Sequence, residues 1–352
     1  MDWNDINETN EAIKLLPLWT SIDMSDSLEL LGSFYQHSKI RQFAVSKLTT
    51  VSDEDELLAY LLQLIQALRY EITYPSDLSE FLLKRCTVSL RLCTFFYWYV
   101  YVETFDRTKG TLFAAILTDF MLILKSNKQS FYKDLQGQIQ LIADLSQLSA
   151  SVNKNRKEKF EKKLINFKQL LTLQGEYSNL IQFSDGYRRI AVRPEICCSG
   201  LIGEECSMFK SALSPLLLSF KTIQQSSETN SSNNIQSSSP SSSSSSSINH
   251  YKVIFKNGDD LRQDQLVIQI INLMDSLLKK VKLDLQLTPY RVLATSPTSG
   301  FVEFIPGSYT LTSILDQYDR NILKFFQFHN ARSSVFAAVF PYHTTFGFCV
   351  GH

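Results

Sequence analysis

The sequence has little that points to nucleic acid, a metal centre or an extracellular setting. Lysines and arginines number 35, and aspartates and glutamates also number 35. Without a net charge, no global field favours nucleic acid or an anionic membrane. The six cysteines include no Cys-x-x-Cys pair, and Cys197 is adjacent to Cys198, which suits neither a zinc site nor a disulfide framework. We therefore expect reduced thiols, no nucleic-acid partner, and membrane contact only through a local patch or a partner.

Long apolar runs are also missing. The two most apolar stretches, 90–102 and 111–124, are shorter than the roughly 20 residues that a membrane-spanning helix needs, and Asp119 interrupts the second. Met1 is followed by acidic and polar residues rather than by a basic and apolar leader. We predict two buried helices in these stretches and a cytoplasmic protein of about two domains.

Residues 1–125 carry short apolar repeats of three and four residues, separated by short breaks. In one of them, residues 52–55 have the composition of a helix cap ahead of a leucine-rich helical period at 57–68. Serial short amphipathic helices favour a stacked, solenoid-like α-helical array. No strict sequence repeat accompanies the pattern, so another kind of all-α domain is the alternative.

Residues 126–175 are basic and polar. The segment 154–163 is rich in lysine, and apolar residues such as Phe160, Phe167 and Leu170 recur at helical spacing. We predict one or two exposed helices that join two domains. The charged run fits a solvated helix face, and docking to a membrane surface is the alternative.

The second half of the chain changes to strand-like segments, and a polar tract interrupts them. Strands are predicted at 189–192, 216–221, 253–255, 291–295 and 301–305. The tract 222–250 is dominated by serine and asparagine, so it has too little apolar surface to offset chain entropy, and we predict disorder. Because closure entropy grows only with the logarithm of loop length, the strands on either side can still pair.

One stretch reads as a strand, a tight turn and a helix in direct succession. After the strand at 253–255, the pair Asn257-Gly258 predicts a turn, and Asp259-Asp260 suits a helix start. The apolar residues that follow repeat at helical spacing as far as the basic pair at 279–280. The sequence therefore predicts a strand, a turn and a helix over this stretch.

This arrangement leaves Lys256 as a lone ammonium at the strand's end. Asp264, in the second turn of the predicted helix, comes close enough to meet it if the helix folds back on the strand. Kinases use a strand lysine held by a helix carboxylate to fix an ammonium against nucleotide phosphates. A surface turn with ordinary solvated charges is the alternative.

Two separate regions resemble one family. The stretch from Lys256 to Asp264, with 287–296 after it, is similar to the kinase N-lobe of phosphatidylinositol 3-kinases, and most similar to the class III, vacuolar protein sorting type. The helical accessory domain of the same kinases is similar to segments 16–19, 26–31, 41–46, 60–71 and 96–99.

The resemblance implies an α+β protein of several domains. A solenoid-like helical accessory domain is expected over 1–125, followed by a basic helical linker over 126–175. An incomplete protein-kinase-like lobe with an antiparallel sheet and a hinge is expected over 176–328, and a divergent, truncated tail over 329–352. The tract 222–250 then lies between two strands of that lobe.

The resemblance also implies which residues meet the phosphates of ATP. Lys256 corresponds to the phosphate-binding lysine, and Asp264 to the carboxylate that orients it. Residues 209–213 correspond to the loop that covers the phosphates, where Lys210 and Ser211 are the candidates. No glycine-rich motif is present there, so a plain hairpin is the alternative for this loop.

On the adenine side, the resemblance implies a hinge at the end of the strand at 301–305. Backbone groups of Glu303 and Ile305 are expected to contact adenine, with Val302 and Phe304 flanking them, and Tyr290 deep in the pocket near the lysine. A buried β-hairpin is the alternative.

The family's catalytic motifs are not found in the sequence. Neither the Asp-Arg-His-x-x-Asn catalytic loop nor the Asp-Phe-Gly metal motif occurs, and Thr345 precedes Phe346-Gly347 where the metal-binding aspartate is expected. The family implies ATP and Mg²⁺ as cofactors, but we expect no catalytic residue and no metal ligand in these 352 residues. The chain alone is therefore predicted to be inactive.

By family, the expected activity is ATP-dependent phosphorylation of phosphatidylinositol at its 3-hydroxyl, giving phosphatidylinositol 3-phosphate for endosomal and autophagic membrane traffic. The implied partners are the membrane lipid, a kinase-like scaffold and a beclin-like subunit, at a cytoplasmic location peripheral to those membranes. One alternative is an inactive scaffold that binds partners through the helical domain. Another is a catalytic half encoded farther downstream.

An N-lobe normally packs against a second lobe. We therefore also expect a contiguous apolar surface around Phe301, Phe304, Phe325 and Phe326.

Overall fold

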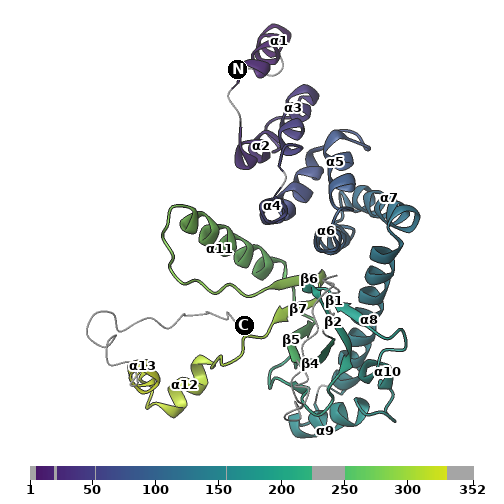
Figure 1. Cartoon of the computed structure of the whole chain (residues 1–352). Helices are drawn as coiled ribbons and strands as arrows, with labels where there is room; N and C mark the ends of the chain where they lie inside the picture. Colours follow the sequence, from purple (N-terminus) through teal and green to yellow (C-terminus); the bar gives the residue numbers. More distant parts are fainter. Residues whose placement is uncertain (1–4, 20–21, 52, 156, 224–249, 331–352) are drawn as a thin grey trace, which may run out of the picture.

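The structure, a computed structural model, describes residues 5–19, 22–51, 53–155, 157–223 and 250–330 (Figure 1). Helices occupy the N-terminal half and an antiparallel sheet follows, which confirms the predicted fold class. The predicted disordered tract lies almost wholly outside the described residues, as does most of the tail at 329–352.

The helical array is the part of the chain from α1 to α7. Its helices are α1 (Ile6–Leu15), α2 (Met24–Leu30), α3 (Ser38–Leu48), α4 (Glu54–Ala67), α5 (Asp77–Arg85), α6 (Leu90–Glu103) and α7 (Gly110–Asn127). Polar side chains cap several of them: the Asp53 carboxylate accepts the Asp55 N–H at 2.9 Å at the start of α4. This is the predicted cap near residues 52–55.

The two most apolar stretches become α6 and α7. Helix α6 is buried along most of its length and packs on α4, α7 and the sheet. Helix α7 buries only one face, formed by Phe113, Ile116, Phe120 and Leu124. By length and composition α7 could cross a membrane, but its buried face packs on α6, as a core helix does. The prediction of buried helices is confirmed for α6 and for one face of α7.

The sheet has seven strands in the order β1-β2-β4-β5-β7-β6, with β3 paired to β4 and every pair antiparallel. The strands are β1 (Arg188–Ile190), β2 (Arg193–Leu201), β3 (Ser207–Met208), β4 (Leu216–Ile223), β5 (His250–Asn257), β6 (Val292–Ser296) and β7 (Ser299–Glu303). Strands β4 and β5 flank the polar tract and pair from Lys221↔His250 to Leu216↔Phe255. The predicted pairing across the tract is confirmed.

The segment predicted as an exposed linker forms α8 (Gln129–Asn153) and α9 (Phe160–Leu170), followed by the short α10 (Ser178–Ile181). Helix α8 is not an exposed connector, because Leu141, Leu145 and other residues of one face are buried and the helix packs on β1 and β5. Within the lysine-rich run, Lys163 is buried and its Nζ lies 3.3 Å from the Asn153 side-chain oxygen. That lysine is therefore not on a solvated face.

The remaining helices are α11 (Arg262–Lys280), α12 (Leu311–Gln317) and α13 (Ile322–Asn330). Figure 1 shows α11 beside the β6 edge of the sheet, and α12 and α13 beyond the end of β7. The helix predicted to end at the basic pair 279–280 is thus confirmed as α11.

The expected apolar surface is wrong in its position. Phe301 is fully buried with its ring centroid 5.1 Å from that of Phe255, and Phe325 and Phe326 are also buried. Strand alternation turns Phe301 toward the helices that cover the sheet. Exposed apolar side chains occur in several parts of the molecule, and one run of them follows α11 and the residues just after it: Leu266, Val267, Ile270, Met274, Leu277, Val281, Leu283 and Leu285.

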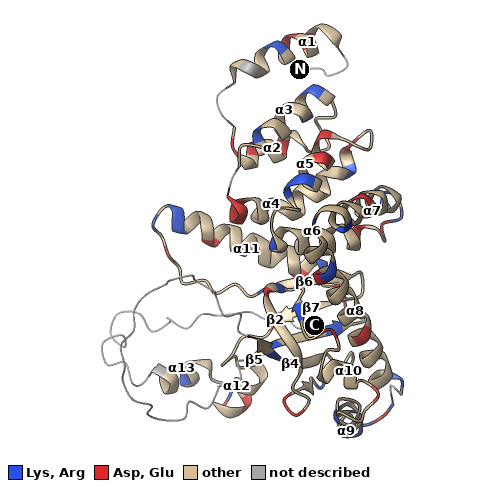
Figure 2. Cartoon of the chain, turned by 45° about the vertical axis from the view of Figure 1, so that its right-hand side comes forward, with Lys and Arg blue, Asp and Glu red and all other residues tan. Residues whose placement is uncertain are grey.

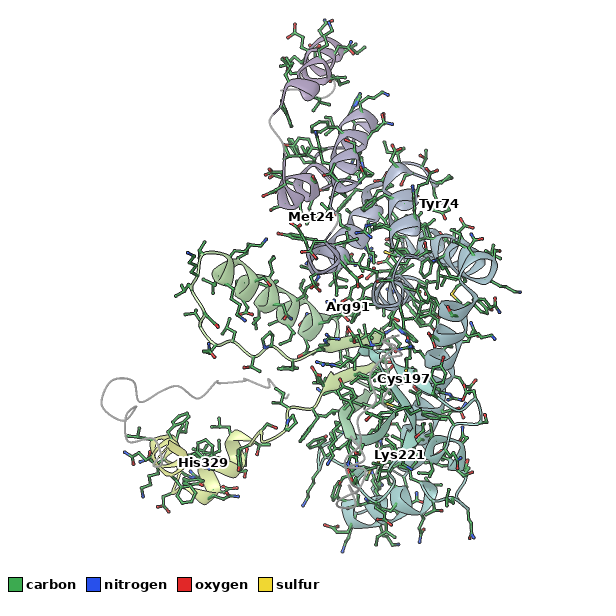
Figure 3. All side chains as sticks on the ribbon, viewed as in Figure 1. Met24, Tyr74, Arg91, Cys197, Lys221 and His329 are labelled. Carbon is green, nitrogen blue, oxygen red and sulfur yellow. The ribbon has the colours of Figure 1, made fainter. Side chains whose placement is uncertain are left out.

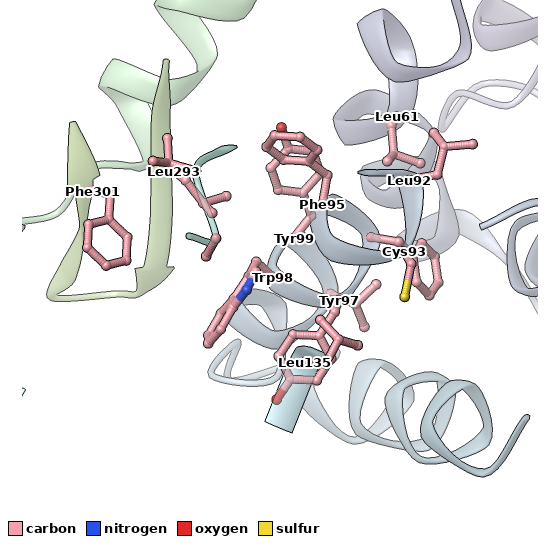
Figure 4. Close-up of a cluster of buried hydrophobic side chains, with 14 of the residues drawn as sticks. Leu61, Leu92, Cys93, Phe95, Tyr97, Trp98, Tyr99, Leu135, Leu293 and Phe301 are labelled. Atoms are coloured by element: carbon pink, nitrogen blue, oxygen red, sulfur yellow. The ribbon is translucent and has the colours of Figure 1, made fainter. Parts of the chain in front are cut away.

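One hydrophobic cluster runs through both halves of the molecule, from Leu16 in the array to Phe301 in the sheet. Figure 4 shows its centre, where Leu293 extends from its strand toward Trp98 and Tyr99 of α6. The indole N–H of Trp98 donates to the Gln138 side-chain oxygen at 2.9 Å, so the polar edge of this buried ring is satisfied by α8. The helices and the sheet therefore share a core.

Within the array, Arg41 joins three helices from a buried position; only 5% of it is exposed. Its guanidinium donates to the carbonyls of Leu31 at 2.8 Å and Ala67 at 3.2 Å, and its Nε lies 2.9 Å from the Glu71 carboxylate. Removing a single partner from a buried ion pair leaves the other charge without compensation.

We predict that Arg41→Met lowers the free energy of unfolding by about 3 kcal/mol, because the Glu71 carboxylate and two helix-end carbonyls lose their donor. Lys39→Met is the matched control: it removes an exposed lysine from the same helix, and we expect a change within about 0.5 kcal/mol. Urea unfolding followed by far-ultraviolet circular dichroism measures both. Equal effects of the two substitutions contradict the role given to Arg41.

Candidate functional site

Lys256 lies near the end of β5, opposite Gly300 of β7. Its Nζ is 3.0 Å from Oδ2 of Asp259, three residues on. The side chain of Asp264, in the first turn of α11, makes no hydrogen bond or ion pair with the described part of the chain. In this structure Lys256 pairs with Asp259 and not with Asp264, because the turn brings Asp259 back to the lysine before the helix begins.

The turn at Gly258 is as tight as the sequence indicates. Gly258 has φ +95°, a region that residues with a Cβ rarely adopt. The N–H groups of Gly258 and Asp259 both donate to the Thr298 carbonyl, at 2.6 and 3.1 Å. The turn after Lys256 is thereby fixed to the turn between β6 and β7.

The loop at 209–213 lies beside this turn. A Cβ added to Gly258 would come within 3.2 Å of Cδ2 of Leu213, the last residue of the loop. The Leu213 carbonyl in turn accepts a hydrogen bond from the Asn153 side chain of α8, at 3.3 Å. Lys210 and Ser211 are both exposed. The structure thus places the two loop candidates near the end of β5, where Lys256 lies.

The adenine-side candidates Val302 and Tyr290 lie on the same sheet face as Lys256. Val302 pairs with Ile254 of β5, and both belong with Tyr290 to one apolar cluster. Lys256 is two residues beyond Ile254, so the period of a strand turns both side chains to one face. The cluster also contains Leu261, from the start of α11, which covers part of this face.

The segment predicted to be a hinge begins where β7 ends at Glu303. The Glu303 N–H donates to the Arg291 carbonyl at 2.8 Å, and the Phe304 N–H donates to the Lys252 carbonyl at 3.2 Å. The N–H of Ile305 makes no hydrogen bond with any described residue, although its carbonyl accepts from Ser308. A backbone donor is therefore available three residues after Val302.

The side chain of Glu303 has contacts that the sequence did not predict, because the resemblance implied only a backbone contact with adenine at this residue. Its carboxylate accepts hydrogen bonds from the Tyr251 hydroxyl and the Arg291 N–H, both at 3.1 Å, and pairs with Arg193 at 2.8 Å. Burial and then the neighbouring carboxylate raise the pKa of Tyr251, which keeps this phenol a donor. A glutamate between apolar strand residues is the signal that could have indicated a buried partner.

Gly300 was also missed, since the sequence analysis began this strand only at residue 301. It lies inside β7, where an added Cβ would meet the Leu293 carbonyl oxygen at 2.4 Å and Leu261 Cδ1 at 2.9 Å. A glycine inside a strand often marks such a close approach. The missing side chain lets α11 begin against the sheet opposite Lys256.

The described residues contain no group of three or more histidine, cysteine, aspartate or glutamate side chains that could hold a metal ion. Two cavities, of about 320 Å³ and 290 Å³, lie at the β2–β4–β5 edge and between α4, α6 and α11. Lys256, Val302 and Tyr290 line neither of them. Of the three candidate residues, Val302 is buried, whereas Lys256 and Tyr290 are partly exposed.

Residues 1–133 match the sequence profile described as "Phosphoinositide 3-kinase family, accessory domain (PIK domain)", and residues 250–343 match the profile "Phosphatidylinositol 3- and 4-kinase". The chain belongs to the phosphatidylinositol 3-kinase family. The resemblance drawn from the sequence is thereby confirmed.

Individual relatives agree with this assignment. The chain is 40% identical over 337 residues to "Phosphatidylinositol 3-kinase pik3" of Schizosaccharomyces pombe, covering 93% of this chain and 38% of that protein. It is 38% identical over 338 residues to "Phosphatidylinositol 3-kinase VPS34" of Arabidopsis thaliana, covering 94% of this chain and 38% of the relative.

A third relative, "Phosphatidylinositol 3-kinase VPS34" of Saccharomyces cerevisiae, is 32% identical over 383 residues, covering 92% of this chain and 39% of the relative. The alignments to all three relatives thus run through nearly the whole chain. The chain nevertheless spans only 38% to 39% of the length of these relatives.

We predict that Gly300→Ala destabilises the chain by about 1–3 kcal/mol, because its methyl group has no room between β6 and Leu261. Gly137→Ala in α8 is the control: its added Cβ makes only an ordinary 3.6 Å contact with Arg188. This helical substitution should stabilise by about 0.5–1 kcal/mol. Denaturant unfolding of both variants measures the difference, and a shift of the same sign in both contradicts the close approach at Gly300.

Proposed function

We propose that this chain is the accessory-domain and ATP-binding portion of a class III-type phosphatidylinositol 3-kinase. The reaction is transfer of the γ-phosphoryl group of ATP to the 3-hydroxyl of phosphatidylinositol. One observation carries the proposal: Lys256 shares a sheet face with Val302 and Tyr290, and the unused N–H of Ile305 lies just past the end of that sheet.

In this proposal, Lys256 binds the phosphates by replacing the Asp259 carboxylate with phosphate oxygens. Both groups of the pair are partly exposed, so a polyanion can reach the ammonium and compete for it. Asp264 has no competing partner among the described residues and would orient the lysine once Asp259 is displaced. Lys210 and Ser211 would cover the phosphates from the loop beside Gly258.

At the other end of β5, the adenine ring would rest on the apolar face formed by Ile254, Val302 and Tyr290. The N–H of Ile305 would donate to a ring nitrogen, and a backbone carbonyl at Glu303 would accept from the exocyclic amine. Phe304 is half-buried beside them. The strand spacing of about 3.3 Å per residue separates Val253, opposite Glu303, from Lys256 by roughly 10 Å, a span suited to a nucleotide.

In this proposal, the described residues bind the nucleotide and hold it in position. Phosphoryl transfer depends chiefly on alignment and on neutralising charge at the moving group. Bound ATP supplies the phosphoryl group. The described residues offer no cluster of metal ligands, so we derive no step through Mg²⁺ from them.

For the whole protein, we propose phosphatidylinositol in a membrane as substrate, with a kinase-like scaffold and a beclin-like subunit as partners. The location would be cytoplasmic and peripheral to endosomal or autophagic membranes. Positive and negative residues balance in the sequence, and Figure 2 shows them interspersed over helices and sheet. Such a surface attracts anionic lipid only weakly, which favours recruitment by partners.

We predict that Lys256→Met weakens binding of Mg·ATP to the purified 352-residue chain by about tenfold or more, since an ion pair with phosphate is lost. The control is Lys221→Met, which removes an exposed lysine from the neighbouring strand β4. Isothermal titration calorimetry measures both affinities. Equal affinities in the two variants would exclude Lys256 as the phosphate ligand, and absence of ATP binding would favour the scaffold alternative.

Removing the charge of Asp264 and removing that of Asp259 should have different effects on ATP affinity. Asp264→Asn should weaken ATP binding by about three- to tenfold, whereas Asp259→Asn should leave it unchanged or tighten it, because a competitor for the ammonium is removed. The same calorimetry on the two variants decides between them. Weaker binding in Asp259→Asn alone would show that Asp259, not Asp264, orients the lysine for the nucleotide.

The 352-residue chain itself is predicted to form no phosphatidylinositol 3-phosphate from ATP and phosphatidylinositol vesicles. Product that is lost in the Lys256→Met variant would overturn this and place the catalytic groups within this chain.

A further inference from the structure

A series of ion pairs crosses from the helical array into the sheet. Arg91, in the first turn of α6, places Nη1 2.6 Å from the Asp55 carboxylate of α4. Its Nε lies 3.6 Å from the Glu195 carboxylate of β2. Figure 3 labels Arg91 where the helices meet the sheet. One guanidinium thus bridges two helices and a strand.

Glu195 is shared with a second arginine. Nη1 of Arg291, the residue before β6, lies 3.2 Å from Oε2 of Glu195. Two arginines from different elements, Arg91 and Arg291, therefore depend on one carboxylate for their position. The carboxylate is about half exposed, whereas both guanidiniums are less so.

Arg291 continues the series through its backbone into the hinge. Its N–H donates to Oε2 of Glu303 at 3.1 Å, and its carbonyl accepts the Glu303 N–H at 2.8 Å. The other carboxylate oxygen of Glu303 receives Arg193 and Tyr251. Glu303 is only 13% exposed, so these contacts fix the residue two positions before the unused N–H of Ile305.

We propose that Arg91, Glu195 and Arg291 are positioning residues for the nucleotide hinge. They tie α4 and α6 of the helical array to Glu303, and so set the direction of the Ile305 N–H. The inference deepens the proposed function, on which it rests, by naming how the accessory domain regulates the same site.

The geometry makes this series responsive to movement of α6. Nε of Arg91 is buried and has no hydrogen bond, so at 3.6 Å it interacts with Glu195 by charge alone. Hydrogen bonds weaken steeply with distance and angle, whereas Coulomb attraction changes gradually. A small shift of α6 toward β2 would therefore complete a directional hydrogen bond that is missing at 3.6 Å. A partner that binds the array and moves this helix would change the hinge, and nucleotide at the hinge would reciprocally stabilise the series.

Hydrogen–deuterium exchange on the full 352-residue chain tests the proposal. The variants are Arg91→Gln, Glu195→Gln and the double substitution, and the readout is exchange in peptides that contain the Glu303 and Phe304 amides. Each single variant should speed this exchange by about two- to fivefold, the range expected for partly exposed ion pairs. The double variant should exceed neither single variant, because both break the same series.

Arg69→Gln is the matched control. It also removes an arginine of the array, of similar exposure (24% against 28% for Arg91), but Arg69 pairs with Glu103 and Asp106 inside the array. Its hinge exchange should match that of the unaltered chain. Unchanged hinge exchange in Arg91→Gln and Glu195→Gln, or an equal increase in Arg69→Gln, would overturn the proposal.

Binding of Mg·ATP to the same variants separates this inference from the proposed function. We expect Arg91→Gln and Glu195→Gln to weaken ATP binding by about two- to fivefold, in step with exchange. If the unaltered chain binds no ATP while hinge exchange responds as expected, the proposed function fails and the coupling stands. If ATP binds with equal affinity in every variant and exchange is unchanged, the coupling fails and the proposed function stands.

Discussion

Burial of helix α6 is the interaction on which both halves of the molecule depend. The helix is covered by α4 and α7 on the side of the array and by β2 and β6 on the side of the sheet. Its aromatic residues each remove a large apolar area from water, and Trp98 adds a satisfied hydrogen bond to α8. The accessory helices are therefore a structural wall of the sheet rather than a separate module beside it.

This constraint decides which sheet face remains for a ligand. Strand alternation directs Phe255 and Phe301 into the core shared with α6, and directs Ile254, Lys256 and Val302 to the opposite face. The lysine proposed to bind phosphate and the apolar residues proposed to bind adenine share a face because their neighbours are buried behind them. The array then reaches the hinge through the polar edge of the same contact, by way of Arg91 and Glu195.

The sequence was sufficient to predict what depends on local pattern. An apolar run predicted α6, and periodicity predicted α11. The turn at Gly258 and the pairing across the serine-rich tract were also expected. Prediction from the sequence failed where a residue's role depends on which other part of the chain packs against it. Periodicity shows that α8 has an apolar face but not that a sheet covers it. Spacing allowed Lys256 to reach Asp264, but the backbone turn brings Asp259 closer. Gly300 and the Glu303 carboxylate act through residues remote in the chain, for which one sequence carries no direct signal.

The central claim is that helical array and sheet form one structure around α6. Differential scanning calorimetry of the 352-residue chain tests it most directly. The account predicts a single unfolding transition whose calorimetric enthalpy matches its van 't Hoff enthalpy, since neither half keeps a closed core when α6 is released. Two resolved transitions, one for the helices and one for the sheet, would contradict it.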